Sequence, residues 1–269
     1  MTNIHPTAVI EDGAQIGEGC SIGPYCIIGP QVTLDKNVTL KAHVVVDGIT
    51  SIGEGTIIYP FASIGTAPQD LKYAGEPSEL IIGKNNTIRE HATMNPGTKD
   101  GGMKTVVGDN NLFMMATHVA HDCIIGDNVI MANNATLGGH VVVGDRVLVG
   151  GLAAVHQFVR IGSFAVIGGM SGVESDVIPF GRVKGERASL AGLNLVGLER
   201  GGFSKEQIKT IQRAFKGIFT GQGNLDQRLD KVAEENNDND LITKIIDFAR
   251  HRERFGLCQP LTKPNQKAA

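Results

Sequence analysis

An apolar residue recurs every six positions through most of the first 173 residues. Eleven such positions run without a gap from Ile4 to Ile64, and twelve more run from Val107 to Val173. A short run of three, ending at Met94, stands between them. A period of six fits neither an α-helix, which repeats every 3.6 residues, nor a single β-strand, which alternates every two. It is typical of a parallel β-helix built from hexapeptide repeats.

The position two residues before each of these apolar residues is also small or β-branched, as at Ala8 and Cys20. Two inward positions around one outward position describe a very short strand. Glycine often follows the apolar residue, as at Gly17, and we expect it to supply the backbone freedom that a tight corner needs. Three strands and three corners make one triangular coil, so the repeats predict about nine coils in a prism about 45 Å long.

The six-residue spacing fails in two places. Asp70 and Glu76 occupy two expected apolar positions, so residues 66–79 are predicted to leave the prism as a loop. Further along, the spacing is one residue too long, which predicts a second excursion over residues 99–104. Long loops on a rigid scaffold often carry function.

Helix signals follow the last repeat. Ser204, with Gln207 three residues later, predicts a capped helix start. Residues 225–236 and 240–250 are two further amphipathic candidates.

The predicted fold class is therefore mainly β. A parallel β-helix is expected over residues 1–185, and it is expected to be left-handed, as known hexapeptide β-helices are, against the usual right-handed crossover. A small α-helical C-terminal domain is expected over residues 186–269.

The sequence composition bears on the cellular location of the protein. Its first residues show no charged and apolar leader, and its uncharged apolar runs are well short of the roughly 18 residues of a membrane-spanning helix. Four cysteines in 269 residues do not make a disulfide framework. We therefore expect a cytoplasmic protein without an integral membrane segment.

Charge is distributed unevenly. The net charge is −3, yet residues 182–216 hold eight cationic and three anionic side chains, a local net charge of +5. This segment is either a basic surface for an acidic partner or phosphate-bearing substrate, or an ordinary solvated helix face.

Histidines gather along one predicted edge of the prism. Gly139 lies one coil after His121, and Gln157 lies one coil after Gly139. The other histidines near this line are His118, His140 and His156. Outward positions have no core to fill, so this convergence predicts a functional site.

Two kinds of site are open. Neutral imidazoles are common zinc ligands, and a histidine can equally act as a general base. The pair His121-Asp122 favours the base, because a neighbouring carboxylate can orient an imidazole and stabilise its charged form. Zinc enzymes on this scaffold use a His-x4-His spacing, whereas His118 and His121 are three apart, so we predict no metal. A zinc carbonic anhydrase and a non-catalytic scaffold protein remain the alternatives.

Several motifs occupy the predicted loop, the histidine edge and the start of the C-terminal region. They are QDLKYAGEP at 69–77, HVAHDC at 118–123, ANNATL at 132–137, GHV at 139–141, AVHQF at 154–158, GLN at 192–194 and GLER at 197–200. In this order and number they resemble the acyl-[acyl-carrier-protein]–UDP-N-acetylglucosamine O-acyltransferases. The resemblance covers nearly the whole chain.

The resemblance implies the first step of lipid A biosynthesis. A 3-hydroxyacyl chain would pass from the phosphopantetheine thioester of acyl carrier protein to the 3-position of UDP-N-acetylglucosamine. It also implies a homotrimer with sites between adjacent prisms, no cofactor of the enzyme's own, and no nucleic-acid partner.

The resemblance further assigns roles to residues. His121 would be the general base, Asp122 would support it, and the backbone N–H of Gly139 would donate to the oxyanion. Lys72 and Arg200 would meet the diphosphate. The full set of implied substrate-binding residues is Asp70, Lys72, Asn95, His118, His140, His156, Gln157, Asn194 and Arg200.

This sequence departs from the family pattern in two places. Asn95 stands where better-known members carry histidine, which leaves open an acceptor with an amine at the sugar 3-position. Arg187 follows Glu186 where others have Asn-His near the end of the acyl chain. Together with Gly169, whose missing side chain leaves room in the groove, Arg187 is expected to bear on chain length and to favour a long chain.

Overall fold

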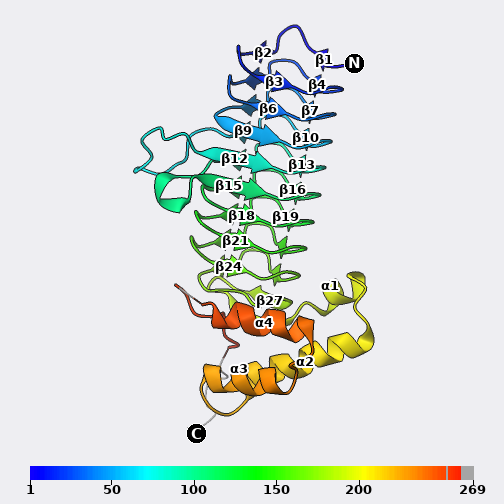
Figure 1. Cartoon of the computed structure of the whole chain (residues 1–269), viewed down its shortest axis with the longest axis vertical. Coiled ribbons are helices and arrows are strands. Elements are labelled where there is room, and N and C mark those ends of the chain that lie inside the picture. Colours follow the sequence, from blue (N-terminus) through cyan, green and yellow to red (C-terminus); the bar gives the residue numbers. More distant parts are fainter. Residues whose placement is uncertain (253, 262–269) are drawn as a thin grey trace.

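The repeats form a parallel β-helix of three sheets (Figure 1), seen in a computed structural model that describes residues 1–252 and 254–261. The second sheet contains nine strands, which agrees with the predicted number of coils. Its strands are β2 (Val9–Ile10), β5 (Ile27–Ile28), β8 (Val45–Val46), β11 (Ser63–Ile64), β14 (Thr93–Met94), β17 (His118–Val119), β20 (Thr136–Leu137), β23 (Ala154–Val155) and β26 (Gly172–Val173).

The other two sheets complete the prism. The first sheet comprises β1 (Asn3–Ile4), β4 (Ser21–Ile22), β7 (Thr39–Leu40), β10 (Ile57–Ile58), β13 (Thr87–Ile88), β16 (Leu112–Phe113), β19 (Ile130–Met131), β22 (Leu148–Val149), β25 (Val166–Ile167), β27 (Gly181–Lys184) and β28 (Ser189–Leu193). The third comprises β3 (Gln15–Ile16), β6 (Thr33–Leu34), β9 (Ile49–Ile52), β12 (Glu79–Ile82), β15 (Lys104–Val107), β18 (Ile124–Ile125), β21 (Val142–Val143) and β24 (Arg160–Ile161).

The six-residue apolar positions fill the interior of the prism. Ile28, Ile64 and Val173 are fully buried, as are most of their equivalents. Ile4 is instead 43% exposed, because no coil lies above the first one to cover it. The core therefore begins with the second coil and continues into the C-terminal helices.

Except for Gly65, which has φ 78°, the glycines after the apolar residues have a different role from the one predicted. Gly23 and Gly126 do not adopt a positive φ; a Cβ on either would overlap atoms of the next coil. The left-handed conformation falls on a later corner residue, such as Asn128 (φ 58°) or His140 (φ 61°). Close stacking of coils, more than backbone freedom, explains these glycines.

Both predicted excursions leave the prism on the same side (Figure 1). No strand lies between β11 and β12, and the second excursion contains a short 3₁₀ helix, Lys99–Gly101. The excursions touch each other, since the N–H of Lys99 donates to the Glu76 carboxylate at 3.0 Å.

Within the described residues, four helices follow the last strands: α1 (Leu195–Arg200), α2 (Lys205–Thr220), α3 (Leu225–Glu234) and α4 (Asp240–Arg250). Ser204 and Gln207 form the predicted capping box of α2. Strand β28 and helix α1 lie inside the segment predicted to be helical. The sequence did not predict the strand, because its five residues are too few to show a clear alternation. Residues 262–269 of the predicted domain lie outside the described residues, and the boundary at residue 185 stays a prediction.

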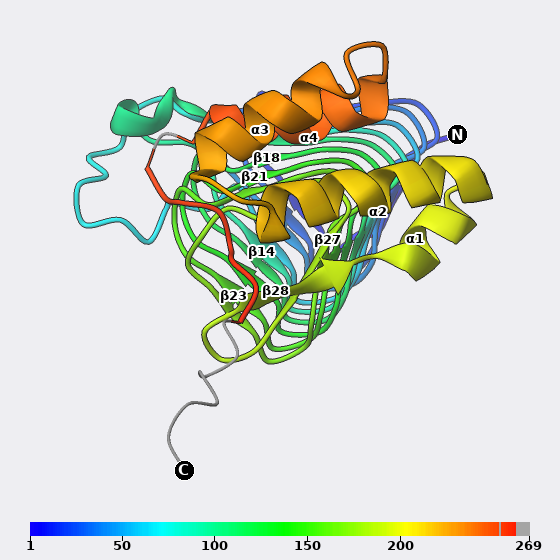
Figure 2. The same cartoon turned by 90° about the horizontal axis from the view of Figure 1, so that it is seen from below.

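In both views the helices lie at the C-terminal end of the prism (Figures 1 and 2). Among the described residues, no helix is long and apolar enough to cross a membrane.

Candidate active site

His121 and Asp122 form a hydrogen-bonded pair at the corner that follows β17. The Nδ1 atom of His121 lies 2.8 Å from Oδ2 of Asp122, whose side chain is fully buried. Asp122 can turn back toward its neighbour because it adopts the left-handed conformation, with φ 59°. This conformation is accessible to aspartate at low cost. The pair leaves Nε2 of His121 facing outward.

Two threonines hold Asp122, one through its carboxylate and one through its backbone. The backbone N–H of Thr98 donates to Oδ1 at 2.9 Å and its hydroxyl donates to Oδ2 at 2.6 Å. The Asp122 N–H in turn donates to the hydroxyl of Thr105 at 2.8 Å. The carboxylate is therefore held in place, and it in turn fixes the orientation of the imidazole and limits rotation of that ring.

The second excursion covers the back of the pair. Gly101 packs so closely that a Cβ there would overlap the Asp122 carboxylate. A glycine at this position lets the loop seal the carboxylate from water, and burial strengthens the hydrogen bonds that the carboxylate accepts.

Gly139 lies directly against the His121 ring. A Cβ on Gly139 would come within 2.5 Å of the ring atom Cε1. Among the described residues, none accepts a hydrogen bond from the N–H of Gly139. The predicted register between these two residues is confirmed by the pairing of His118 with Thr136, eighteen residues apart.

A column of rings continues the corner beyond His121. His140 meets the His121 ring edge-on, with centroids 5.1 Å apart, and stacks on Phe158 at 4.2 Å. Burial lowers the pKa of His140, and the charges of His121 and Arg254 lower it further against the opposing effect of Asp122. The His140 imidazole is therefore neutral near neutral pH.

Asp70 approaches the ring from the loop side. Its Oδ2 atom lies 3.9 Å from Nε2 of His121. Lys72 lies beside it and is highly exposed, with its Nζ atom 3.9 Å from the Asp100 carboxylate. A substrate hydroxyl placed between Asp70 and His121 would meet an acceptor on both sides.

These side chains line one pocket of about 860 Å³. It contains five of the predicted site residues: Asp70, Lys72, His121, His140 and Gln157. The remaining lining residues are Gln69, Leu71, Thr98, Asp100, Phe158 and Arg254. The loop, the histidine edge and the C-terminal segment therefore converge on one cavity.

His118 and Asn95 lie near the pocket but do not line it. Nδ1 of His118 is 2.7 Å from the Thr93 hydroxyl. The pKa of His118 is lowered, chiefly by burial and also by the charge of His121. Buried Asn95 donates to the carbonyl of Thr66 at 2.9 Å, so its amide holds the start of the loop.

His156 faces the C-terminal segment. Its ring is exposed and meets Phe255 edge-on, with centroids 5.4 Å apart. Its Nδ1–H donates to the carbonyl of Gln157 at 3.1 Å, if that nitrogen carries the proton.

Asn194 and Arg200 are not brought to the pocket by this chain. Asn194 caps α1, accepting from the N–H of Gly197 at 3.0 Å, and Arg200 is in the last turn of that helix. The loop and α1 lie on opposite sides of the prism in both views (Figures 1 and 2). Gly169 is exposed, and Arg187 pairs with Glu174 at 3.1 Å; neither lines the pocket.

Sequence reasoning missed several residues of the site. Thr98 and Thr105 lie 24 and 17 positions before Asp122, so no short motif joins them to it. Arg254 reaches the pocket from beyond α4, and only tertiary packing brings it there. Phe158 could have been found, because it lies one coil after His140.

His121, Asp122 and His140 are close enough for their ligand atoms to surround a metal ion. Their hydrogen bonds argue against that use. Nδ1 of His121 is occupied by Asp122, and both oxygens of that carboxylate accept from Thr98. The donor set therefore fits an oriented base better than an open zinc site.

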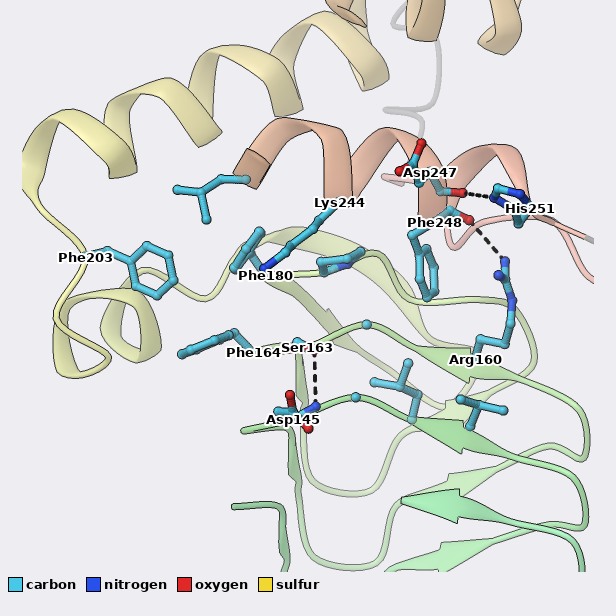
Figure 3. A pocket seen from close by; sticks show the side chains of 16 residues that line it. Asp145, Arg160, Ser163, Phe164, Phe180, Phe203, Lys244, Asp247, Phe248 and His251 are labelled. Atoms are coloured by element: carbon cyan, nitrogen blue, oxygen red, sulfur yellow. Dashed lines mark hydrogen bonds between the residues drawn. The ribbon is translucent and has the colours of Figure 1, made fainter. Parts of the chain in front are cut away.

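A second pocket, of about 620 Å³, lies between the last coils and α4 (Figure 3). Phe164, Phe180, Phe203 and Phe248 give it an aromatic lining, and the Lys244 side chain extends into it. None of the predicted site residues lines this pocket.

Two family models match the chain. The second domain of UDP N-acetylglucosamine O-acyltransferase matches residues 176–258, and the bacterial transferase hexapeptide model matches residues 13–48 and 104–139. An acyl-[acyl-carrier-protein]–UDP-N-acetylglucosamine O-acyltransferase of Rickettsia rickettsii (strain Sheila Smith) is 64% identical over 258 residues, covering 96% of this chain and 98% of that protein.

Solved structures agree along the whole length. The crystal structure of a UDP-N-acetylglucosamine acyltransferase superposes with a TM-score of 0.94 at 43% identity, covering 97% of this chain and 100% of that one. The UDP-N-acetylglucosamine acyltransferase from Campylobacter jejuni superposes with a TM-score of 0.91 at 41% identity, covering 96% of this chain and 99% of that one. These relatives favour neither a zinc carbonic anhydrase nor an amine acceptor. The chain belongs to the acyl-[acyl-carrier-protein]–UDP-N-acetylglucosamine O-acyltransferases.

Proposed function

We propose that the pocket around His121 transfers a 3-hydroxyacyl chain from acyl carrier protein to the 3-hydroxyl of UDP-N-acetylglucosamine, in lipid A biosynthesis. The observation that carries the proposal is the buried Asp122 carboxylate bonded to Nδ1 of His121, which leaves Nε2 directed into the pocket beside Asp70. The named relatives match this chain over nearly its whole length.

His121 acts as the general base in this proposal. Its Nε2 takes the proton of the sugar hydroxyl while the oxygen attacks the thioester carbonyl carbon. Asp122 holds the proton on Nδ1 and stabilises the imidazolium. The tetrahedral intermediate then collapses, the carbon–sulfur bond breaks, and the thiolate leaving group takes the proton from His121. The histidine activates the acceptor directly, so no acyl-enzyme is formed.

The N–H of Gly139 is the proposed donor to the oxyanion. It lies beside the base, and no described residue accepts its hydrogen bond. A backbone donor aimed at developing charge can lower the barrier without reorganisation. No metal or other cofactor takes part in this mechanism, since the reactive thioester arrives on the phosphopantetheine of the carrier protein.

We propose a hydroxyl acceptor and not an amine. The relatives carry the name O-acyltransferase, and the Asn95 amide is engaged with the start of the loop. His118, His156 and Gln157 remain proposed contacts of the substrate, and Gly169 and Arg187 are proposed to bear on the length of the acyl chain.

A homotrimer is the proposed assembly. Asn194 and Arg200 lie across the prism from the loop, so one chain cannot bring them to its own pocket. A neighbouring copy could present its α1 at this pocket, which would join Arg200 to Lys72 for binding of the diphosphate. The four free and buried cysteines fit the reducing cytoplasm, the proposed location.

The test measures acyl transfer by the purified wild-type protein and by two variants, one at His121 and one at Asp122. His121→Ala should lower kcat about 10²- to 10⁴-fold, because it removes the general base. Asp122→Asn should also lower kcat while leaving the KM values close to normal. His43→Ala serves as the control, since His43 is an exposed corner histidine in a distant coil. Unchanged transfer by His121→Ala would refute the mechanism.

A further inference from the structure

Arg254 reaches the active-site pocket from the C-terminal segment, opposite the loop. Its guanidinium lies 3.6 Å from the centroid of the Phe158 ring. It lines the same pocket as Lys72 and His121. It also borders a neighbouring pocket of about 440 Å³, lined in part by His140 and Phe255. Arg254 therefore stands at the boundary between the two cavities.

The position of this arginine is built into the fold. Arg160 donates to buried Asp176 at 2.6 Å and to the carbonyl of Phe248 in α4 at 3.2 Å. The backbone of Asp176 exchanges hydrogen bonds with the C-terminal segment, at Gly256 (3.0 Å) and Cys258 (2.8 Å). These bonds fasten the chain on both sides of Arg254 to the last coils.

The charge of Arg254 is not neutralised by any side chain in the part of the protein that the structure describes. Within residues 1–252 and 254–261, no carboxylate pairs with it and none of its N–H groups has an acceptor. Lys72, on the facing wall, is close to Asp100. Contact with Phe158 restricts the side chain and leaves the N–H groups in the plane of the guanidinium, where none of the described residues accepts from them.

The pocket is polarised as a result. Asp70 and the Nε2 atom of His121 lie on the side of the loop, where acceptors suit sugar hydroxyls. Arg254 lies on the side of the C-terminal segment, where a planar cation suits an oxyanion. His140 between them is neutral near neutral pH, because burial lowers its pKa.

We propose that Arg254 binds a phosphate group of the substrates in the pocket that contains His121. This inference rests on the proposed function, in which both substrates carry phosphate: the diphosphate of the nucleotide sugar and the phosphodiester of phosphopantetheine. The residue binds substrate and takes no part in proton transfer.

The experiment compares Arg254→Ala and Arg254→Lys with wild-type protein. Arg254→Ala should raise the KM for one phosphate-bearing substrate about 10- to 100-fold while kcat changes little, the effect expected from losing a charged hydrogen bond. Arg254→Lys should recover part of that loss, because it keeps the charge without the planar fork. Arg250→Ala is the matched control, since Arg250 pairs with Asp230 outside the pocket.

Two arms identify the phosphate. A raised KM for UDP-N-acetylglucosamine, with weaker calorimetric binding of UDP, assigns Arg254 to the diphosphate. A raised KM for acyl carrier protein assigns Arg254 to the phosphodiester, provided that the KM for acyl-pantetheine, which lacks the phosphate, is not raised. Unchanged KM values for both substrates in Arg254→Ala would overturn the inference. Failure of the proposed function is distinct, because the wild-type protein would then show no transfer.

Discussion

At the scale of single residues, the site depends on how His121 is held. Its ring has Asp122 on one nitrogen, Asp70 near the other, and Gly139 against its face. Each contact restricts the imidazole to one orientation. A base that is already oriented loses little freedom when the substrate arrives, which lowers the barrier to proton transfer.

The substitution Gly139→Ala tests this arrangement. The added methyl group would overlap the His121 ring and push it away from the acceptor hydroxyl. We expect kcat to fall at least about 10²-fold, since small displacements of reacting groups cost that much. The thermal midpoint should change far less than activity.

Gly256→Ala is the control for Gly139→Ala, because a Cβ at that position meets no heavy atom within 4 Å. Assays of transfer and circular dichroism melting would be run on both variants. Wild-type activity in Gly139→Ala would show that the close approach does not position the ring.

The two neutral histidines predict a pH dependence of stability. Burial lowers the pKa values of His118 and His140 from 6.5 in the folded protein. Below pH 6.5 the unfolded chain therefore takes up protons that the folded protein does not, and the free energy of unfolding falls with decreasing pH. Denaturant unfolding between roughly pH 5 and pH 8 should show a shallower decline for His118→Gln and His140→Gln than for wild type. Equal slopes would contradict the assignment.

At the scale of elements, the loops and helices add functional side chains to an otherwise regular prism. The 3₁₀ helix Lys99–Gly101 covers Asp122, and the first loop brings Asp70 to His121. Helix α2 turns an apolar face to the core, where Ile211 and Ile218 are buried. Its outer face carries four exposed cations: Lys205, Lys209, Arg213 and Lys216.

We predict that acyl carrier protein docks on the cationic face of α2. Lys205→Glu combined with Arg213→Glu should raise the KM for acyl carrier protein, and this KM should depend less on salt than in wild type. The KM for UDP-N-acetylglucosamine should stay the same. Lys231→Glu on α3 controls for charge reversal alone, since Lys231 is exposed on another helix. An unchanged KM for the carrier protein would place docking elsewhere.

At the scale of the whole molecule, the predicted substrate-binding residues divide into two groups. One group lies in or near the pocket beside the loop, and the other, Asn194 and Arg200, lies with α1 across the prism. In the proposed trimer, a complete site would require two copies, one giving His121 and the other giving α1.

Mixed assemblies test that requirement. His121→Ala and Arg200→Ala should each be nearly inactive alone. When the two are unfolded, mixed and refolded together, some sites combine an intact His121 with an intact Arg200 from the neighbour. Transfer should then exceed that of either variant refolded by itself. No recovery, with trimers of mixed composition confirmed by mass spectrometry, would show that the sites are not shared.

The repeat made most of the fold predictable. A six-residue period allows few structures besides a three-sided β-helix, and stacking of coils fixes which residues meet. The vertical line through His121 and Gly139 follows from that period alone. The motifs along the chain indicated the family, and the broken repeats marked both loops.

Only the tertiary structure decided what surrounds that line. Thr98 bonds to Asp122 because a loop folds back, and Arg254 stacks on Phe158 because the last segment is fastened to the final coils. Such contacts have no period in the sequence, since they depend on where irregular segments end in space. The sequence by itself therefore determined the prism and its histidine edge, while packing of the loops and the C-terminal segment decided the shape and charge of the pocket.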